Sequence, residues 1–122
     1  MFVFDERELT DTAAPTVLAK MRTGIETKDA LLKELALCLK FPSYFGMNWD
    51  ALEECLCDLS WLPPGIVLLK HLDLPLAADA ENSKKYLSIL HSAVRATHAS
   101  NTHTLIAFFP ESTRQRIFAI LR

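Results

Sequence analysis

The chain has 122 residues, half of them hydrophobic and few of them Gly or Pro, which predicts one folded domain and excludes a low-complexity chain. It lacks an apolar run of the ~18–20 residues that a membrane span needs, and its N-terminus, MFVFDERELTD, is acidic where a signal peptide is basic. We therefore expect a cytoplasmic protein without membrane contact. The formal net charge of -2 disfavours direct nucleic-acid binding, which needs a basic patch.

Short apolar runs along the chain predict buried strands at residues 16–22, 65–70 and 104–109, and residues 2–4 are either an extra edge strand or a docked arm. Helical patterns separate these runs, and a strand followed by a helical crossover pairs in parallel with the next strand. The sequence thus predicts a small α/β domain with a three-stranded parallel sheet.

Helices are expected at residues 28–40, 49–59, 82–98 and 111–121, from apolar residues at helical spacing. Thr27 and Asn48 are suitable N-caps for the first two, and Pro42 follows the end of the first. We expect a single domain over residues 1–122, with an N-terminal extension (1–15), a core (16–109) and a C-terminal helix (110–122).

An acidic stretch stands out between the first two helices. Residues 42–61, PSYFGMNWDALEECLCDLSW, contain no Lys, Arg or His and carry four carboxylates: Asp50, Glu53, Glu54 and Asp58. On a wheel of about 100° per residue, these acids and Cys57 share one side of the helix, whereas Leu52, Cys55, Leu56 and Leu59 lie opposite. The helix is therefore expected to have one core face and one acidic face.

The acidic face is either an ordinary solvated surface or a binding face. Like charges at i,i+4, as in Asp50–Glu54 and Glu54–Asp58, destabilise a helix by roughly 0.2–0.5 kcal/mol per pair. The preceding loop favours binding, because it places Tyr44, Phe45, Met47 and Trp49 around Gly46, and not all four can be buried there. Aromatic side chains beside carboxylates suit the docking of a basic protein.

The motif YFGMNWDALEECL (residues 44–56), preceded by KELALCLKFP (residues 33–42), resembles the barstar family, intracellular inhibitors of barnase-type ribonucleases. The resemblance spans residues 16–109 and is most specific over residues 41–61. It implies a three-stranded parallel sheet with flanking helices and a basic ribonuclease, or a related toxin nuclease, as partner. It also implies an immunity protein of bacterial type, monomeric when free.

The resemblance also implies roles for the motif residues. Asp50 and Glu54 would take the place of RNA phosphates, Tyr44 would cover the catalytic His of the nuclease, and Gly46, Asn48 and Trp49 would shape the loop contact. Glu53 and Asp58 complete the predicted partner-binding set. The chain departs from the family pattern where Glu53 replaces an aromatic residue, Glu54 replaces an Asp, and Ser92 aligns with an interface acid, so the target nuclease stays open.

Other chemistries are disfavoured. Cys38, Cys55 and Cys57 are expected to be free thiols, and Cys55 and Cys57 lie about 160° apart on the wheel, so they cannot hold one metal together. We expect no metal, no cofactor and no enzyme, because the spacing pairs Cys57 with none of the histidines (His71, His91, His98 and His103) and no phosphate-binding Gly motif is present.

Several residues outside the motif are expected to have structural or surface roles. Trp61 is interpreted as a core or turn residue, and His91 and His98 as surface residues of a helix. His71 and Asp73, at a strand end, are either structural or reach the partner.

Two hypotheses follow. The first is a ribonuclease inhibitor. The alternative is an interaction module that kept the barstar scaffold while its partner is not a ribonuclease, and Glu53 and Ser92 favour it.

Overall fold

A computed structural model describes residues 2–10 and 14–122 of the chain. Residues 1 and 11–13, which belong to the predicted N-terminal extension, lie outside the described part. The elements in chain order are β1 (Phe2–Val3), α1 (Glu6–Thr10), β2 (Val17–Lys20), α2 (Lys28–Cys38), α3 (Trp49–Asp58), β3 (Gly65–Lys70), α4 (Ala80–His98), β4 (His103–Phe108), the 3-10 turn η1 (Glu111–Thr113) and α5 (Arg114–Leu121).

The sheet is parallel throughout and has the order β1-β4-β3-β2. The three strands predicted from the apolar runs form its centre and one edge, and Phe2–Val3 adds the fourth strand beside β4. The α/β class and the parallel pairing are therefore confirmed. Of the two readings of residues 2–4, the edge strand is the one observed.

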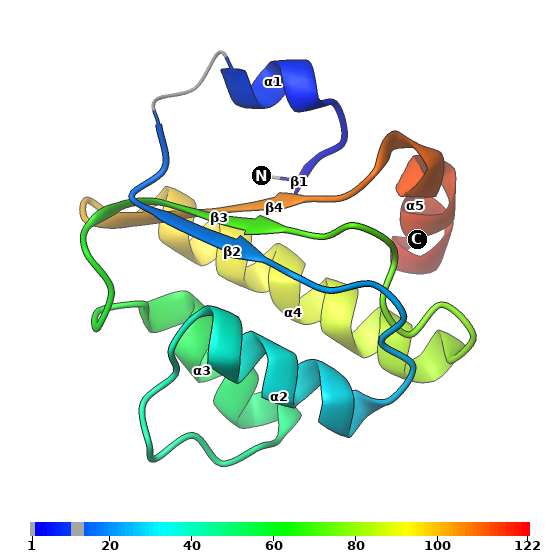
Figure 1. Cartoon of the computed structure of the whole chain (residues 1–122), viewed down its shortest axis with the longest axis horizontal. Coiled ribbons are helices and arrows are strands. Elements are labelled where there is room, and N and C mark those ends of the chain that lie inside the picture. Colours follow the sequence, from blue (N-terminus) through cyan, green and yellow to red (C-terminus); the bar gives the residue numbers. More distant parts are fainter. Residues whose placement is uncertain (1, 11–13) are drawn as a thin grey trace.

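The two faces of the sheet are covered differently (Figure 1). Helices α2, α3 and α4 lie on one face and enclose the main core, which includes Leu32, Leu56 and Tyr86. On the other face lies α1, whose Leu9 packs against a smaller cluster of Val3, Leu68, Ile106 and Phe108. Among the described residues, no helix is long and apolar enough to cross a lipid bilayer.

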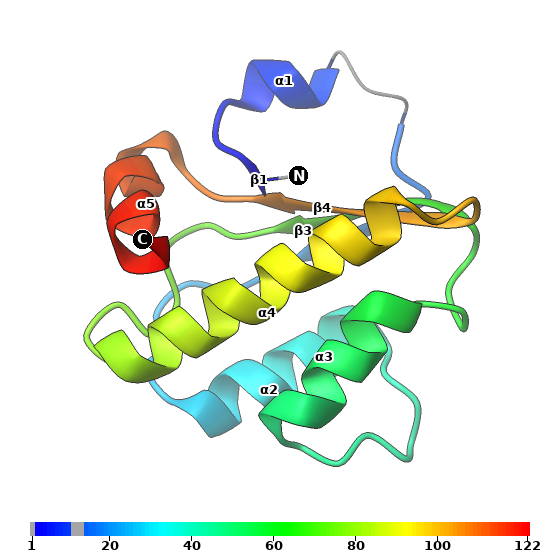
Figure 2. The same ribbon diagram turned by 180° about the vertical axis from the view of Figure 1, so that it is seen from behind.

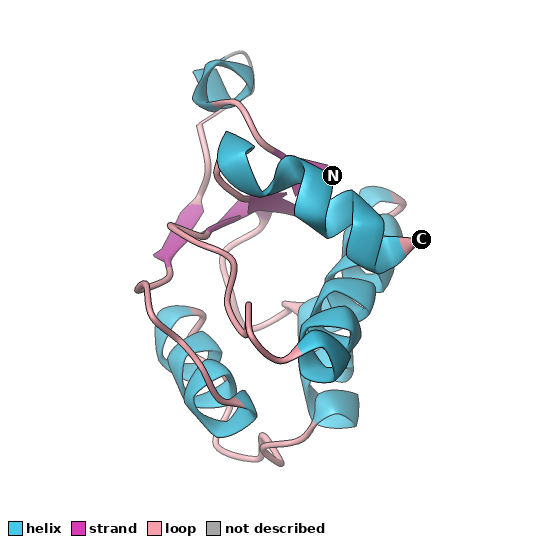
Figure 3. Cartoon of the chain, turned by 90° about the vertical axis from the view of Figure 1, so that its right-hand side faces the viewer, coloured by secondary structure: helices cyan, strands magenta, loops and turns pink. Residues whose placement is uncertain are grey.

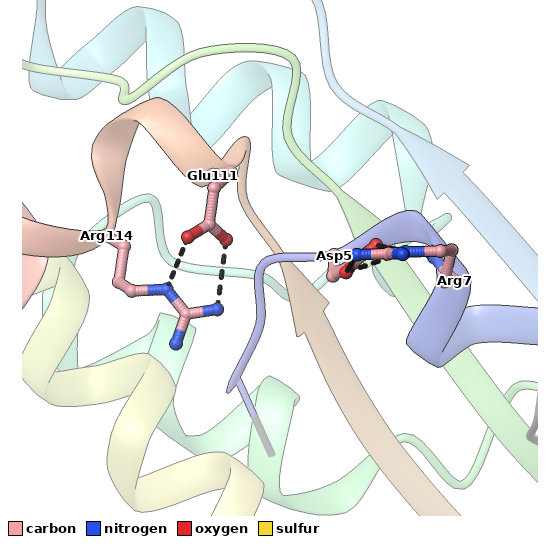
Figure 4. Close-up of polar contacts among 4 residues, drawn as sticks. All are labelled: Asp5, Arg7, Glu111 and Arg114. Carbon is pink, nitrogen blue, oxygen red and sulfur yellow. Dashed lines mark hydrogen bonds and ion pairs between the residues drawn. The ribbon is translucent and has the colours of Figure 1, made fainter.

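The short helix α1 is not predicted by the sequence analysis. Asp5 starts it, because its carboxylate accepts a hydrogen bond of 2.9 Å from the Arg7 backbone N–H and pairs with the Arg7 guanidinium at 2.8 Å. A similar pair joins Arg114 to Glu111 at the start of α5 (Figure 4). Both pairs are local and solvent-exposed, so they add little stability.

Packing and strand pairing hold the N-terminal segment in place. Phe2 pairs with Ala107 of β4, and Phe4 is almost fully buried, with the Phe118 ring 5.6 Å away and the Arg114 guanidinium 4.8 Å above it. Burying one Phe contributes roughly 1.5–3 kcal/mol. The apolar side chains of residues 2–4 therefore anchor the segment to the sheet and to α5.

Candidate functional site

The N-terminus of α3 is built by Asn48. Its side-chain oxygen accepts a hydrogen bond of 2.8 Å from the Ala51 backbone N–H, and its amide nitrogen donates one of 3.2 Å to the Gly46 carbonyl. A Cβ atom at Gly46 would lie 3.3 Å from that same amide nitrogen, so a larger residue would crowd this contact. Asn48 and Gly46, both predicted contact residues, thus fix the shape of the loop and its junction with the helix.

Aromatic packing holds the rest of the loop. The ring of Phe45 lies 4.8 Å from that of Phe41, which lies 5.7 Å from Trp61. The Trp61 indole N–H donates a hydrogen bond of 2.9 Å to the Leu39 carbonyl, which confirms Trp61 as a core and turn residue. Tyr44, in contrast, is 75% exposed. The packed rings of Phe41, Phe45 and Trp61 therefore support a loop whose Tyr44 ring faces solvent.

Trp49, the first residue of α3, is half-buried against the main core. The Lys28 ammonium group lies 5.3 Å above the centre of its ring, which is a cation–π contact. Trp49 therefore packs against the core and stabilises the fold. Met47 is 38% exposed and is, besides Tyr44, the second large apolar side chain of the loop that is exposed to solvent.

The predicted two-faced helix is observed in α3. Leu52, Cys55 and Leu56 are buried, whereas Asp50, Glu54, Cys57 and Asp58 are exposed and Glu53 is half-buried. Within residues 2–10 and 14–122, none of the four carboxylates lies within ion-pair distance of a basic group. Asp58 accepts a hydrogen bond of 3.0 Å from the Ser60 hydroxyl. We call the four carboxylates and Cys57 the acidic face.

The acidic face has cations near it in space, although none is near it in the sequence. A groove of about 430 Å³ between α3 and α4 is lined by Asp50 and Glu53 of α3 and by Glu81, Lys84 and Lys85 of α4. The two lysines cannot be assigned to this site from the sequence, because their position depends on how α4 packs against α3. The distribution of charges along the sequence does not predict how these two helices pack.

On the opposite flank of the acidic face, no basic group is among the described residues that line the surface. A hollow of about 210 Å³ is lined by Tyr44, Phe45, Ala51, Glu54, Cys55 and Asp58. It combines an exposed aromatic ring with two carboxylates. The flank that carries Glu54, Asp58 and Tyr44 is therefore the more negative side of the surface. On the flank of Asp50 and Glu53, Lys84 and Lys85 reduce the negative charge.

The cysteines of α3 lie on opposite faces as predicted, with Cys55 buried and Cys57 exposed. Desolvation raises the pKa of the Cys57 thiol, and the nearby Glu53 carboxylate raises it further. Cys57 is thus held in its protonated and weakly nucleophilic form. In the part of the chain that the structure describes, no three His, Cys, Asp or Glu side chains gather in a way that could hold a metal ion.

Of the two residues whose role the sequence leaves open, His71 is structural, whereas for half-buried Asp73 both alternatives stay open. The His71 ring is buried, stacked on Phe109 at 3.9 Å, and hydrogen-bonded to the Phe108 carbonyl and the Tyr86 hydroxyl. The Asp73 carboxylate accepts a hydrogen bond of 2.9 Å from the Gly24 N–H. His91, His98 and Ser92 are exposed on α4, as expected for the two histidines.

Comparison with known protein families identifies the family of this chain. The family model described as barstar (barnase inhibitor) matches residues 16–109. The chain belongs to the barstar family. Its members are inhibitors rather than enzymes, and the family implies a ribonuclease as the protein partner. A search of curated proteins found no match.

Proposed function

We propose that this protein inhibits a basic, barnase-type ribonuclease, or a related toxin nuclease, by inserting α3 and the preceding loop into its active-site cleft. It would act in the cytoplasm as a monomer and would need no cofactor. The observation that carries the proposal is the acidic face, whose four carboxylates form no ion pair with any residue that the structure describes, next to the exposed ring of Tyr44.

Charge complementarity supplies the mechanism. A nuclease binds RNA phosphates with Arg, Lys and His, and the carboxylates of Asp50 and Glu54 would take the place of those phosphates. Charge-assisted hydrogen bonds to carboxylates are stronger than neutral ones, and bidentate contacts with Arg add specificity. The field of the acidic face would also steer a cationic partner and raise the association rate.

The other residues of the set have distinct tasks in this proposal. Tyr44 would cover the catalytic side chain of the nuclease, since its ring is free to contact a partner. Gly46, Asn48 and Trp49 would act by holding the loop in shape, which their contacts with one another and with the core support. Glu53 and Asp58 would extend the negative surface on the two flanks of α3.

The double variant Asp50→Ala, Glu54→Ala tests this proposal. It removes both like-charge pairs at i,i+4, Asp50–Glu54 and Glu54–Asp58, so we expect the free energy of unfolding to change by less than about 1 kcal/mol. Inhibition of the nuclease should weaken by about 100-fold or more, because each truncation leaves a buried cation of the partner unpaired.

The matched control is Glu8→Ala, Glu26→Ala, which changes the net charge equally at two exposed positions outside α3. It should inhibit like the wild type. Inhibition that survives in the α3 variant would place the binding site elsewhere, and an equal loss in both variants would mean that only net charge matters.

The alternative, a barstar-fold interaction module with another kind of partner, is favoured by Lys84 and Lys85 beside Asp50 and Glu53. These lysines suit a partner of mixed charge better than a uniformly basic one. Binding to such a partner would fall only modestly as the salt concentration rises, whereas an acid-to-base interface loses association rate steeply.

A further inference from the structure

A second surface feature lies away from the acidic face. An apolar groove of about 730 Å³ is formed by α4, α5 and β1, with Val94, Phe118 and Leu121 among the apolar side chains that line it. Figure 2 shows α5 and the N-terminus on one side of α4 and α3 on the other. In the side view of Figure 3, α5 and α4 again lie next to each other. We call this feature the α4–α5 groove.

The groove leaves apolar surface open to solvent. Phe118 is 52% exposed although its ring contacts Phe4, and Leu121 is only half-buried. Val94 forms part of the floor and is 7% exposed. A concave apolar surface of this volume is in the range of binding sites.

Basic side chains surround the groove. Arg95 and Arg122, together with His91 and His98, complete its lining, and no acid contributes to it. Among the described residues, neither arginine lies within ion-pair distance of a carboxylate. The surrounding sequence is also basic, since residues 82–122 contain six Lys and Arg and a single acid, Glu111, which pairs with Arg114.

The lining residues follow helical spacing on both walls. His91, Val94, Arg95 and His98 are at i, i+3, i+4 and i+7 of α4, and Phe118, Leu121 and Arg122 are at i, i+3 and i+4 at the end of α5. Each wall therefore presents apolar surface beside one arginine. The shape and the charge complement a helix that carries an apolar stripe between two rows of carboxylates.

We propose that the α4–α5 groove binds an acidic amphipathic helix of a partner protein. One arginine on each wall favours a ligand with several carboxylates over one with a single carboxylate, which would neutralise one arginine and leave the other. A second copy of this chain does not supply such a helix, because the apolar residues of its acidic α3 are buried in its own core. The groove is separate from the acidic face, so this site is independent of ribonuclease inhibition.

The probe is a synthetic peptide of about 18 residues, long enough to form a helix on binding, with Leu and Phe at i, i+3, i+4 and i+7 and Glu on both flanks. A scrambled peptide of the same composition serves as control. Titration is followed by two-dimensional ¹H–¹⁵N NMR of the full chain at physiological salt. We expect saturable shifts at residues 91–98 and 117–122 with a Kd below about 100 µM, and none with the scrambled peptide.

Two charge-reversal variants make the test specific. Arg95→Glu, Arg122→Glu should weaken peptide binding by about tenfold or more. The control Lys84→Glu, Lys85→Glu, an equal change nearer the start of α4, should bind like the wild type. Circular dichroism verifies that both variants fold.

Several results would overturn the proposal: no saturable shifts, equal binding of the scrambled peptide, or equal loss in both variants. Binding to anionic phosphatidylglycerol vesicles without peptide binding would also overturn it and point to a lipid surface. Self-association through the groove, seen by sedimentation, would contradict it as well. None of these results bears on nuclease inhibition, which is measured separately.

Discussion

The buried pair of His71 and Tyr86 shows how one residue couples the sheet to the helices. The Phe108 carbonyl can only accept, so His71 Nδ1 carries the proton and donates the bond of 2.9 Å to it. His71 Nε2 then accepts from the Tyr86 hydroxyl at 2.7 Å. The pair links the end of β3 to β4 and to α4. Burial holds the imidazole neutral, because desolvation lowers the pKa of His71 from its ordinary 6.5 to about 4.

This environment predicts a pH-dependent stability. The unfolded chain takes up a proton on His71 near pH 6.5, whereas the folded chain does so only near pH 4. The unfolded state therefore binds more protons within this window, and stability is lost as the pH falls through it. At about 1.36 kcal/mol per pKa unit, the loss attributable to His71 is about 3 kcal/mol.

The measurement is urea denaturation of the wild type and of His71→Gln between pH 7 and pH 4. A Gln amide can donate to the Phe108 carbonyl and accept from Tyr86, but it does not titrate. We expect the variant to have a shallower decline of the free energy of unfolding. Parallel declines for the two proteins would contradict a neutral, buried His71.

At the scale of elements, α3 shows what could be predicted from the sequence. The spacing of Leu52, Cys55 and Leu56 was sufficient to predict the core face, and Asn48 was sufficient to predict the N-cap. Both signals are local, so no tertiary information was needed. The lysines of α4 beside Asp50 could not be predicted, because they reach the acidic face only through the packing of two helices that are distant in sequence.

The first elements of the chain are too short to be predicted from the spacing of apolar residues. Helix α1 spans five residues, too few to show a repeat of apolar positions, and its Leu9 packs against the smaller core cluster of the sheet. The strand at Phe2–Val3 was an open alternative because two paired residues carry little pattern. Elements this short depend on tertiary contacts rather than on their own sequence.

The Asn48 cap gives a prediction for α3. Replacing Asn48 with Ala removes the bond to the Ala51 N–H and the bond to the Gly46 carbonyl. We expect the free energy of unfolding to fall by about 1–2 kcal/mol, as measured by chemical denaturation. The control Asn48→Asp keeps an acceptor for the Ala51 N–H and should recover most of the loss. Equal losses for Ala and Asp would show that the cap itself contributes little.

At the scale of the whole molecule, the charge is separated although the net charge is small. Residues 41–69 contain four acids and no Lys or Arg, and residues 82–122 contain six Lys and Arg and one acid. The chain belongs to the barstar family over residues 16–109, which implies a ribonuclease partner, and under the proposed function the acidic part binds that partner. The basic C-terminal part includes Arg95 and Arg122, which line the α4–α5 groove, and Lys84 and Lys85, which lie beside Asp50 and Glu53.

The most direct test of the central claim is a titration of this protein into a barnase-type ribonuclease, with RNA cleavage as readout. It is run at ~0.01 M and ~0.15 M salt, where the Debye length is ~30 Å and ~8 Å. We predict stoichiometric inhibition, with association that slows markedly at the higher salt. A nuclease that stays fully active with excess protein at both salt concentrations would contradict the claim that the acidic face of α3 is a ribonuclease-binding surface.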